Sequence, residues 1–278
     1  MRVIVTESAD EFAARAGELL ASRIGHNMLA TVLAGIRARP SSASPVLVYV
    51  EDEGGLIVAA ALRTPPRPML ATTMDAATVG LLMDTWLEHD PEVPGVNAPR
   101  ELARSLARAW AGRTGGTTTL ALSLAMHTLE RVCEPSRPAS GRLRPAGEDD
   151  RELVVPWMGA FTREAGVDGA SDAADIVGRG IERGLLYVWD DDGLVALVGH
   201  SPAVAGVVRI GPVYTPPQLR ARGYASSAVA ALSRAALEGG AEQCALFTDL
   251  ANPTSNRIYA ALGYRRVGDW EDIRFVRR

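Results

Sequence analysis

The sequence predicts an α/β fold built on a mixed sheet. Short apolar runs with strand character alternate with longer stretches of helical periodicity along the whole chain. Hydrophobic residues make up 47% of the 278 residues, which is enough to bury a sizeable core. A segment rich in proline and glycine near the middle divides the chain into two halves of similar length. Two domains are therefore expected.

The first domain, residues 1–133, is expected to open with helices over residues 10–39. The runs VLVYVED and LIVAAALRT then predict two strands around the turn DEGG. Helices at about 76–89 and 98–112 follow, and the strand TTTLALSLAMHTL ends this half. Residues 134–144 are interpreted as a linker, and residues 145–278 as the second domain.

The second domain is expected to begin with an amphipathic helix in which Leu153, Trp157 and Phe161 share a face with Val154 and Met158. The stretch DAADIVGRGIERG predicts another helix. The runs LLYVWDDDG, LVALVGHS and VAGVVRIGPVYT predict consecutive antiparallel strands. The turn PPQLRARG, a helix at about 223–238, the strand QCALFTDL, a helix at about 253–262 and a final strand complete the order.

Composition excludes several functions. A formal net charge of -4 argues against a non-specific nucleic-acid binder. All 29 cationic residues are arginine, so a Walker-type phosphate loop and lysine chemistry are excluded. The two cysteines and four histidines are scattered, and we expect no disulfide and no metal site. The N-terminal residues do not form a signal peptide and no apolar run approaches membrane-spanning length, so a cytoplasmic protein that does not bind membranes is expected.

The turn before the helix at 223–238 has the features of a phosphate site. The N-terminus of a helix directs free N–H groups and a positive dipole at one point, and Arg220 and Arg222 add charged donors. Gly223 allows positive φ or close backbone approach, and Ala225 and Ser226 are small. The alternative interpretation is a solvated turn that simply begins a helix.

A second stretch decides between these interpretations. The segment NPTSNRIYAALGY together with VYTPPQLRARGYASS resembles the GNAT superfamily of acetyl-CoA-dependent N-acetyltransferases. The family's pyrophosphate motif, R/Q-x-x-G-x-G/A, matches Arg220, Gly223 and Ala225, and its second pattern, N-x-x-S/A-x-x-x-Y-x-x-x-G-F/Y, matches five positions: Asn252, Ser255, Tyr259, Gly263 and Tyr264. Both motifs occur in the family's order, and the element succession of residues 142–278 is similar to the family fold.

The resemblance implies a site for acetyl-CoA, with no metal, in a gap between the strand that ends near Val213 and the strand QCALFTDL. The pantetheine arm would bond main-chain groups of Val213 and Thr215. The implied cofactor-binding residues are Val213, Thr215, Arg220, Ala221, Arg222, Gly223, Tyr224, Ala225, Ser226, Asn252 and Ser255. Many relatives have glycine where this chain has Ala221, and the methyl group fits if the φ of Ala221 is negative.

The resemblance also implies a reaction by direct attack of an amine on the thioester. Tyr259 would donate a proton to the leaving sulfur, and a main-chain N–H near Val213 would polarise the carbonyl. The alternative for Tyr259 is a core aromatic residue. His200, Asp249, Glu271 and Asp272 are available as a general base, but each is more often a turn, cap or surface residue, and none is assigned.

The first half resembles a degenerate GNAT-like copy, with an unrelated α/β domain as the alternative. In this hypothesis GVNAPRELARSLARAW occupies the place of PPQLRARGYASSAVAAL.

The expected function is transfer of an acetyl group to a primary amine of a small molecule or peptide. A catalytically inactive coenzyme-binding module is the alternative, and aminoacyl transfer from tRNA is weaker because no basic face is evident. The sequence identifies neither the acceptor nor the oligomeric state.

Overall fold

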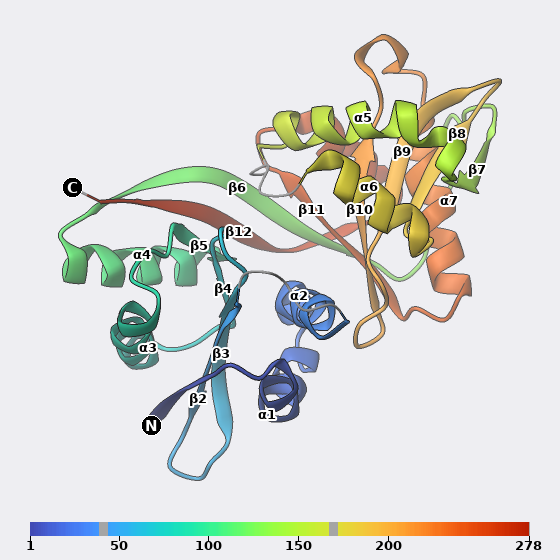
Figure 1. Cartoon of the computed structure of the whole chain (residues 1–278). Coiled ribbons are helices and arrows are strands. Elements are labelled where there is room, and N and C mark those ends of the chain that lie inside the picture. The colour runs from blue at the N-terminus through green and yellow to red at the C-terminus, as the bar shows by residue number, and fades with distance from the viewer. Residues whose placement is uncertain (39–43, 167–171, 278) are drawn as a thin grey trace. The chain divides into compact units, whose positions relative to one another are not determined.

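The computed structural model describes residues 1–38, 44–166 and 172–277 (Figure 1). Contacts divide the chain into one unit of Met1–Leu124 with Gly268–Arg278 and a second unit of Ala125–Val267. The first unit therefore has other bounds than the expected domain 1–133, because it includes the end of the last strand. That strand pairs with a strand of the first half, with Trp270 opposite Pro99 and Arg274 opposite Gly95. Of the expected linker, residues 142–144 lie in a strand of the second unit.

In the first unit the predicted helices and strands are present, together with strands that the sequence did not predict. In chain order they are β1 (Arg2–Thr6), α1 (Ala9–Ala21), η1 (Ile24–His26), α2 (Asn27–Ala38), β2 (Val46–Glu51), β3 (Ile57–Arg63), β4 (Met69–Ala71), α3 (Ala76–His89), β5 (Gly95–Pro99), α4 (Arg100–Thr114) and β6 (Thr117–Leu129). The strands β1, β4 and β5 were not expected from the sequence. They are only three to five residues long, too short for a clear periodicity.

The second unit repeats this order. Its elements are β7 (Arg142–Pro145), η2 (Glu148–Asp150), α5 (Arg151–Glu164), α6 (Ala173–Glu182), β8 (Leu186–Asp190), β9 (Leu194–His200), β10 (Val207–Tyr214), η3 (Pro217–Leu219), α7 (Tyr224–Glu238), β11 (Gln243–Asp249), α8 (Pro253–Ala261) and β12 (Arg265–Val276). The strands β6 and β12 each have residues in both units.

The two units share one sheet topology. In the first, β1, β2, β3 and β4 are successively antiparallel and β4 is parallel to β5. In the second, β7, β8, β9 and β10 are successively antiparallel and β10 is parallel to β11. Since each parallel pair requires a crossover, α3 and α7 are the crossover helices of the two units. The shared order supports the interpretation of the first half as a second copy of the fold.

This repeat corrects the expected correspondence between the halves. The segment GVNAP forms β5, which follows the crossover helix, so by element order it matches β11 and not the turn after β10. The segment that matches the turn is residues 72–75, between β4 and α3.

Helices cover both faces of the second unit's sheet (Figure 1). One face packs on α7 through Val208, Ile210 and Val229, and the other packs on α5 through Leu197 and Tyr214. On α5 the buried residues are Val154, Trp157 and Met158, whereas Leu153, which was expected on the apolar face, is 43% exposed. The apolar face is therefore centred on Val154 rather than on Leu153.

Candidate active site

The parallel strands β10 and β11 separate after a short paired segment. Their register covers Val207–Arg209 opposite Gln243–Ala245, while β10 continues to Tyr214 and β11 to Asp249. The pairing of β10 with β9 also shifts between Ile210 and Val213. The expected splay of these two strands is confirmed. Beyond the paired segment, the main-chain groups of β10 and β11 do not hydrogen-bond one another.

Two of the predicted residues lie where β10 borders this gap. Val213 lies opposite Val198 of β9. Thr215 is 9% exposed, and its buried Oγ1 has no hydrogen-bond partner among the described residues. Because a buried hydroxyl without a partner is unfavourable, this oxygen is suited to a polar group of a ligand.

The turn between β10 and α7 contains two residues with positive φ. Gly223 has φ 86°, and a Cβ atom there would lie 3.1 Å from the carbonyl oxygen of Arg137. Ala221 has φ 61°. The condition under which the methyl group was expected to fit, a negative φ, is therefore not met: the turn uses the left-handed conformation at the position where many relatives have glycine. A left-handed alanine costs about 1 kcal/mol.

The first turn of α7 is free of negative charge. Gly223 caps the helix without a side-chain hydrogen bond, and the first turn contains no acidic residue. The N–H groups at the start of a helix have no intrahelical acceptors, and here they belong to Tyr224, Ala225 and Ser226. The Tyr224 ring is buried, and its hydroxyl donates to Asp191 at 2.8 Å. The helix end is therefore fixed in place and open to an anion.

The Arg220 side chain holds the turn together. Its Nε donates to the carbonyl oxygen of Thr215 at 2.9 Å, and Nη2 donates to Glu164 at 2.6 Å. Its guanidinium also lies 5.7 Å from the ring centroid of Tyr214. Arg222 makes a long contact of 3.5 Å with the carbonyl oxygen of Gln218. In this geometry the exposed Arg222 has more freedom to reach a phosphate than Arg220.

The residues of the second motif meet at the start of α8. Asn252 is the N-cap, and its Oδ1 accepts from the N–H of Ser255 at 3.0 Å. Asn256 joins the end of β11 to this helix: its Oδ1 accepts from Thr248 at 2.7 Å, and its Nδ2 donates to the carbonyl oxygens of Asp249 at 2.9 Å and Asn252 at 2.8 Å. The structure thus gives Asn252 and Ser255 a capping role beside the binding role that remains predicted.

Tyr259 lies one turn further along α8. It is 8% exposed, and its ring meets Tyr264 edge-on with centroids 5.9 Å apart. Burial raises the pKa of Tyr259 to about 12. Burial is the cause of this shift, and no hydrogen bond from a described residue to the Tyr259 hydroxyl contributes to it. The group is therefore neutral at physiological pH and keeps its proton available for donation.

The four residues considered as a general base all have structural contacts. His200 bonds the carbonyl oxygen of Ser201 at 2.8 Å, and Asp249 accepts from the N–H of Ala251 at 2.8 Å. Glu271 accepts from Arg104 at 2.7 and 2.9 Å within the first unit. Asp272 lies in the same unit, 3.0 Å from an arginine in β12. None of these contacts favours a catalytic base.

The corresponding place in the first unit carries a negative charge. Asp75 is the N-cap of α3 and accepts from the N–H of Thr78 at 2.7 Å. This backbone hydrogen bond lowers the pKa of Asp75. A carboxylate that occupies the helix end repels phosphate, so the end of α3 is less suited to an anion than the end of α7.

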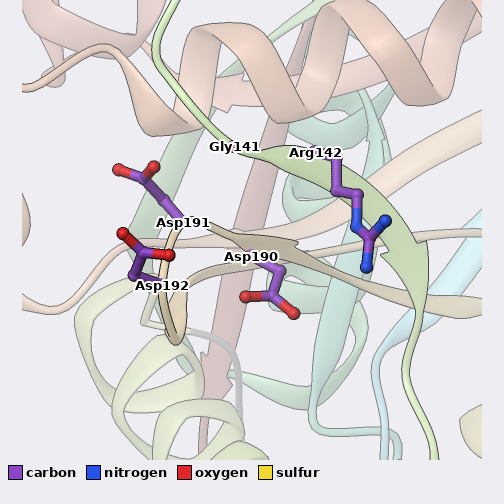
Figure 2. Close-up of a pocket in the computed structure, with 5 residues that line it drawn as sticks. All are labelled: Gly141, Arg142, Asp190, Asp191 and Asp192. Carbon is purple, nitrogen blue, oxygen red and sulfur yellow. The ribbon is translucent and has the colours of Figure 1, made fainter.

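An acidic hollow lies at the turn between β8 and β9. Figure 2 shows Asp190, Asp191 and Asp192 of this turn near Gly141 and Arg142, and the cavity measures about 390 Å³. The Asp191 carboxylate is already hydrogen-bonded to Tyr224 and Ser140.

In the described part of the chain no group of three or more histidine, cysteine or acidic side chains has the arrangement of a metal site. The helices there also lack the length and apolar character that crossing a bilayer requires.

The sequence analysis assigned no role to two residues of this region, Arg209 and Asn256. Arg209 has a sequence signal, because it is the one charged residue within the apolar run VVRIGPVY. Asn256 stands inside the second motif but outside its fixed positions, so only the structure shows that it joins β11 to α8.

Comparison with known proteins gives the same fold. Residues 193–275 match the model of the FR47-like protein family. Over 100% of both chains, the structure is similar to an acetyltransferase of the GNAT family from Colwellia psychrerythraea, with 15% identity and a TM-score of 0.63. A GCN5-related N-acetyltransferase from Sphaerobacter thermophilus has 16% identity and a TM-score of 0.64, with 99% of this chain and 96% of that chain covered.

A tandem GNAT protein from the clavulanic acid biosynthesis pathway is also similar. It shows 14% identity and a TM-score of 0.59, with 99% of this chain and 98% of that chain covered. No curated protein matches the sequence. At these identities the solved structures establish the fold, and they agree with the repeat of element order in the two units.

Proposed function

The chain has the GNAT acetyltransferase fold, and from that premise we propose that it transfers an acetyl group from acetyl-CoA to a primary amine of a small molecule or peptide. The observation that carries the proposal is the parting of β10 and β11 beside a helix end without acidic residues. This pair of features suits the extended pantetheine arm and the pyrophosphate of one ligand.

The residues of the second unit fit coenzyme A in three respects. The Thr215 hydroxyl, which has no partner in the described part of the chain, suits a polar group of pantetheine. The first turn of α7, with Ala225 and Ser226, offers N–H groups to the pyrophosphate. Gly223 supports the turn through its positive φ, and the absence of a Cβ there leaves room for the carbonyl oxygen of Arg137. When bound, acetyl-CoA supplies a thioester activated toward amines.

The chain's own residues would assist the transfer at two atoms. A main-chain N–H near Val213 polarises the carbonyl oxygen while the C–N bond forms. The Tyr259 hydroxyl donates its proton to the sulfur as the C–S bond breaks, and its pKa of about 12 keeps it protonated for that role. The amine must lose a proton to water or to a base that the structure does not single out.

The binding test uses a matched pair of variants. Ala225 and Ala77 are both the second residue of a crossover helix, α7 and α3 respectively. We expect Ala225→Glu to weaken acetyl-CoA binding at least tenfold in calorimetry, because it places a carboxylate at the proposed pyrophosphate site. Ala77→Glu should bind as tightly as the wild type. Equal binding by all three proteins would contradict the placement of the site.

Turnover separates an enzyme from the alternative, an inactive coenzyme-binding module. Release of free coenzyme A is followed with a thiol reagent in the presence of a panel of primary amines. Acceleration by at least one amine supports the enzyme. Tight binding of acetyl-CoA without acceleration by any amine would support the module instead.

A further inference from the structure

Arg209 is a charged residue in the middle of β10, the strand that borders the gap. Its neighbours Val208 and Ile210 are buried in the core beneath α7. Because successive side chains of a strand point to opposite faces, Arg209 lies on the other face of the sheet. Tyr214 of the same strand packs on that face against α5.

The Arg209 guanidinium has no partner among the described residues. Its Nη1 is buried without a hydrogen bond, and no described carboxylate lies within ion-pair distance. Burial lowers its pKa, but a guanidinium remains charged in a protein. Arg209 as a residue is half-buried, with its Nη1 fully buried, whereas the buried Arg63 is paired with Asp90. A guanidinium with a buried nitrogen and no described counter-charge is unfavourable, and in this respect Arg209 differs from Arg63.

The main chain fixes Arg209 at the closed end of the gap. Arg209 and Ala245 are the last registered pair before β10 and β11 part. The Arg209 N–H donates to the Ser201 hydroxyl at 3.0 Å, and its carbonyl oxygen accepts from the Ser201 N–H at 2.8 Å. Ala245 is small and fully buried, so β11 presents only a methyl group beside the arginine.

We propose that Arg209 binds a carboxylate of the substrate at the closed end of the gap. A guanidinium matches a carboxylate with two parallel hydrogen bonds, and ligand binding would then supply the missing counter-charge. The carboxylate belongs either to the amine acceptor, as in an amino acid, or to the acyl group of the donor. This inference rests on the proposed function and adds a substrate class to it.

The test compares substrates that differ only in this charge. One arm uses acetyl-CoA with amino acids and with the corresponding amino acid amides. The other arm uses succinyl-CoA and butyryl-CoA with one neutral amine. We expect one arm to show a preference in kcat/KM for the carboxylate of about 10- to 100-fold. The arm that shows it identifies which substrate carries the group.

Variants connect the preference to Arg209. We expect Arg209→Met to remove the preference and Arg209→Lys to retain part of it, while the exposed Arg265→Met keeps the wild-type ratio. Arg209→Met should also melt no lower than the wild type without ligand, because it removes a half-buried charge that has no partner among the described residues. A large fall in its melting temperature, or the absence of a preference in both arms, would overturn the inference.

A binding measurement keeps the inference separate from the proposed function. Thermal shifts are measured for wild type and Arg209→Met with N-acetylglycine and with N-acetylglycinamide. A shift by the carboxylate alone, lost in Arg209→Met, supports Arg209 even if no amine is acylated. If acetyl-CoA binds and amines react but neither carboxylate test shows a preference, the proposed function stands and the role of Arg209 fails.

Discussion

The side-chain amide of Asn256 accepts a hydrogen bond of 2.7 Å from Thr248, which joins the last residues of β11 to the first turn of α8. The same amide donates to two main-chain oxygens, those of Asp249 and Asn252. Tyr259, the proposed general acid, lies on the same helix. Asn256 therefore helps to hold the start of the helix that carries Tyr259. The residue acts through Tyr259 and is a positioning residue.

We therefore expect Asn256→Ala to lower kcat more than it changes KM. Loss of three hydrogen bonds at a partly buried position should also reduce the free energy of unfolding by about 1–3 kcal/mol. Steady-state kinetics and chemical denaturation measure the two effects. Thr254→Ala, at an exposed position of the same helix, is the control and should behave as the wild type. A change in KM alone would contradict the positioning role.

Tyr259→Phe should lower kcat about 10²-fold or more, within the range of general acid catalysis. Because no described residue bonds the hydroxyl, folding stability at neutral pH should change little. The pKa of Tyr259, raised to about 12 by burial, implies that the wild-type acid stays protonated up to about pH 11. In the pH profile of the wild-type kcat, deprotonation of Tyr259 should therefore cause no fall in kcat below that pH. An unchanged kcat in Tyr259→Phe would contradict the role as general acid and would show that Tyr259 is a core aromatic residue.

Ala221→Gly should leave the fold intact and stabilise it slightly. Glycine removes the cost of about 1 kcal/mol for a left-handed alanine, but it also loses more conformational entropy on folding, so the net gain is expected between about 0 and 1 kcal/mol. Denaturant titration measures it. Ala225→Gly is the comparison, because Ala225 lies within a helix, where glycine should destabilise. A clear loss of stability in Ala221→Gly would contradict the conclusion that the positive φ of Ala221 is unfavourable.

Much of this arrangement could be predicted from the sequence. Periodicity placed α3, α7 and β6 close to their observed bounds, and the two motifs located the turn and α8. Other features depend on contacts distant in sequence. The correspondence of the first half was misassigned because β4 is only three residues long and gives no periodic signal. That Arg209 has no partner among the described residues depends on the register of β10 with β11, which a single sequence does not contain.

The difference between the two helix ends predicts one acetyl-CoA per chain. Asp75 occupies the end of α3, whereas the end of α7 has no acidic residue. Calorimetry should therefore give a stoichiometry of one. Asp75→Ser should leave that number unchanged while lowering the melting temperature slightly, because serine keeps a capping oxygen but loses the favourable charge at the helix N-terminus. Two sites in the wild type would show that the first unit also binds the coenzyme.

The ion pair between Arg144 and Asp150 predicts how the second unit responds to acid. Asp150 is 8% exposed, and it accepts from Arg144 at 2.7 and 2.8 Å and from the N–H of Gly147 at 2.8 Å. The Arg144 guanidinium lowers the pKa of Asp150. Because the folded-state pKa lies below the unfolded value of about 3.9, this stabilisation is complete above that pH and is lost as the pH falls below it.

Asp150→Asn should consequently cost about 2 kcal/mol of unfolding free energy at pH 7, because a charged hydrogen bond is replaced by a neutral one. The difference from the wild type should shrink as the pH falls below about 4. Denaturant titrations at pH 7, 5 and 3.5 measure this trend. Glu148→Gln is the control, because Glu148 is exposed and makes only a 3.4 Å contact with Arg151. A difference that stays constant across this pH range would show that the stabilisation comes from geometry rather than from the charge of Asp150.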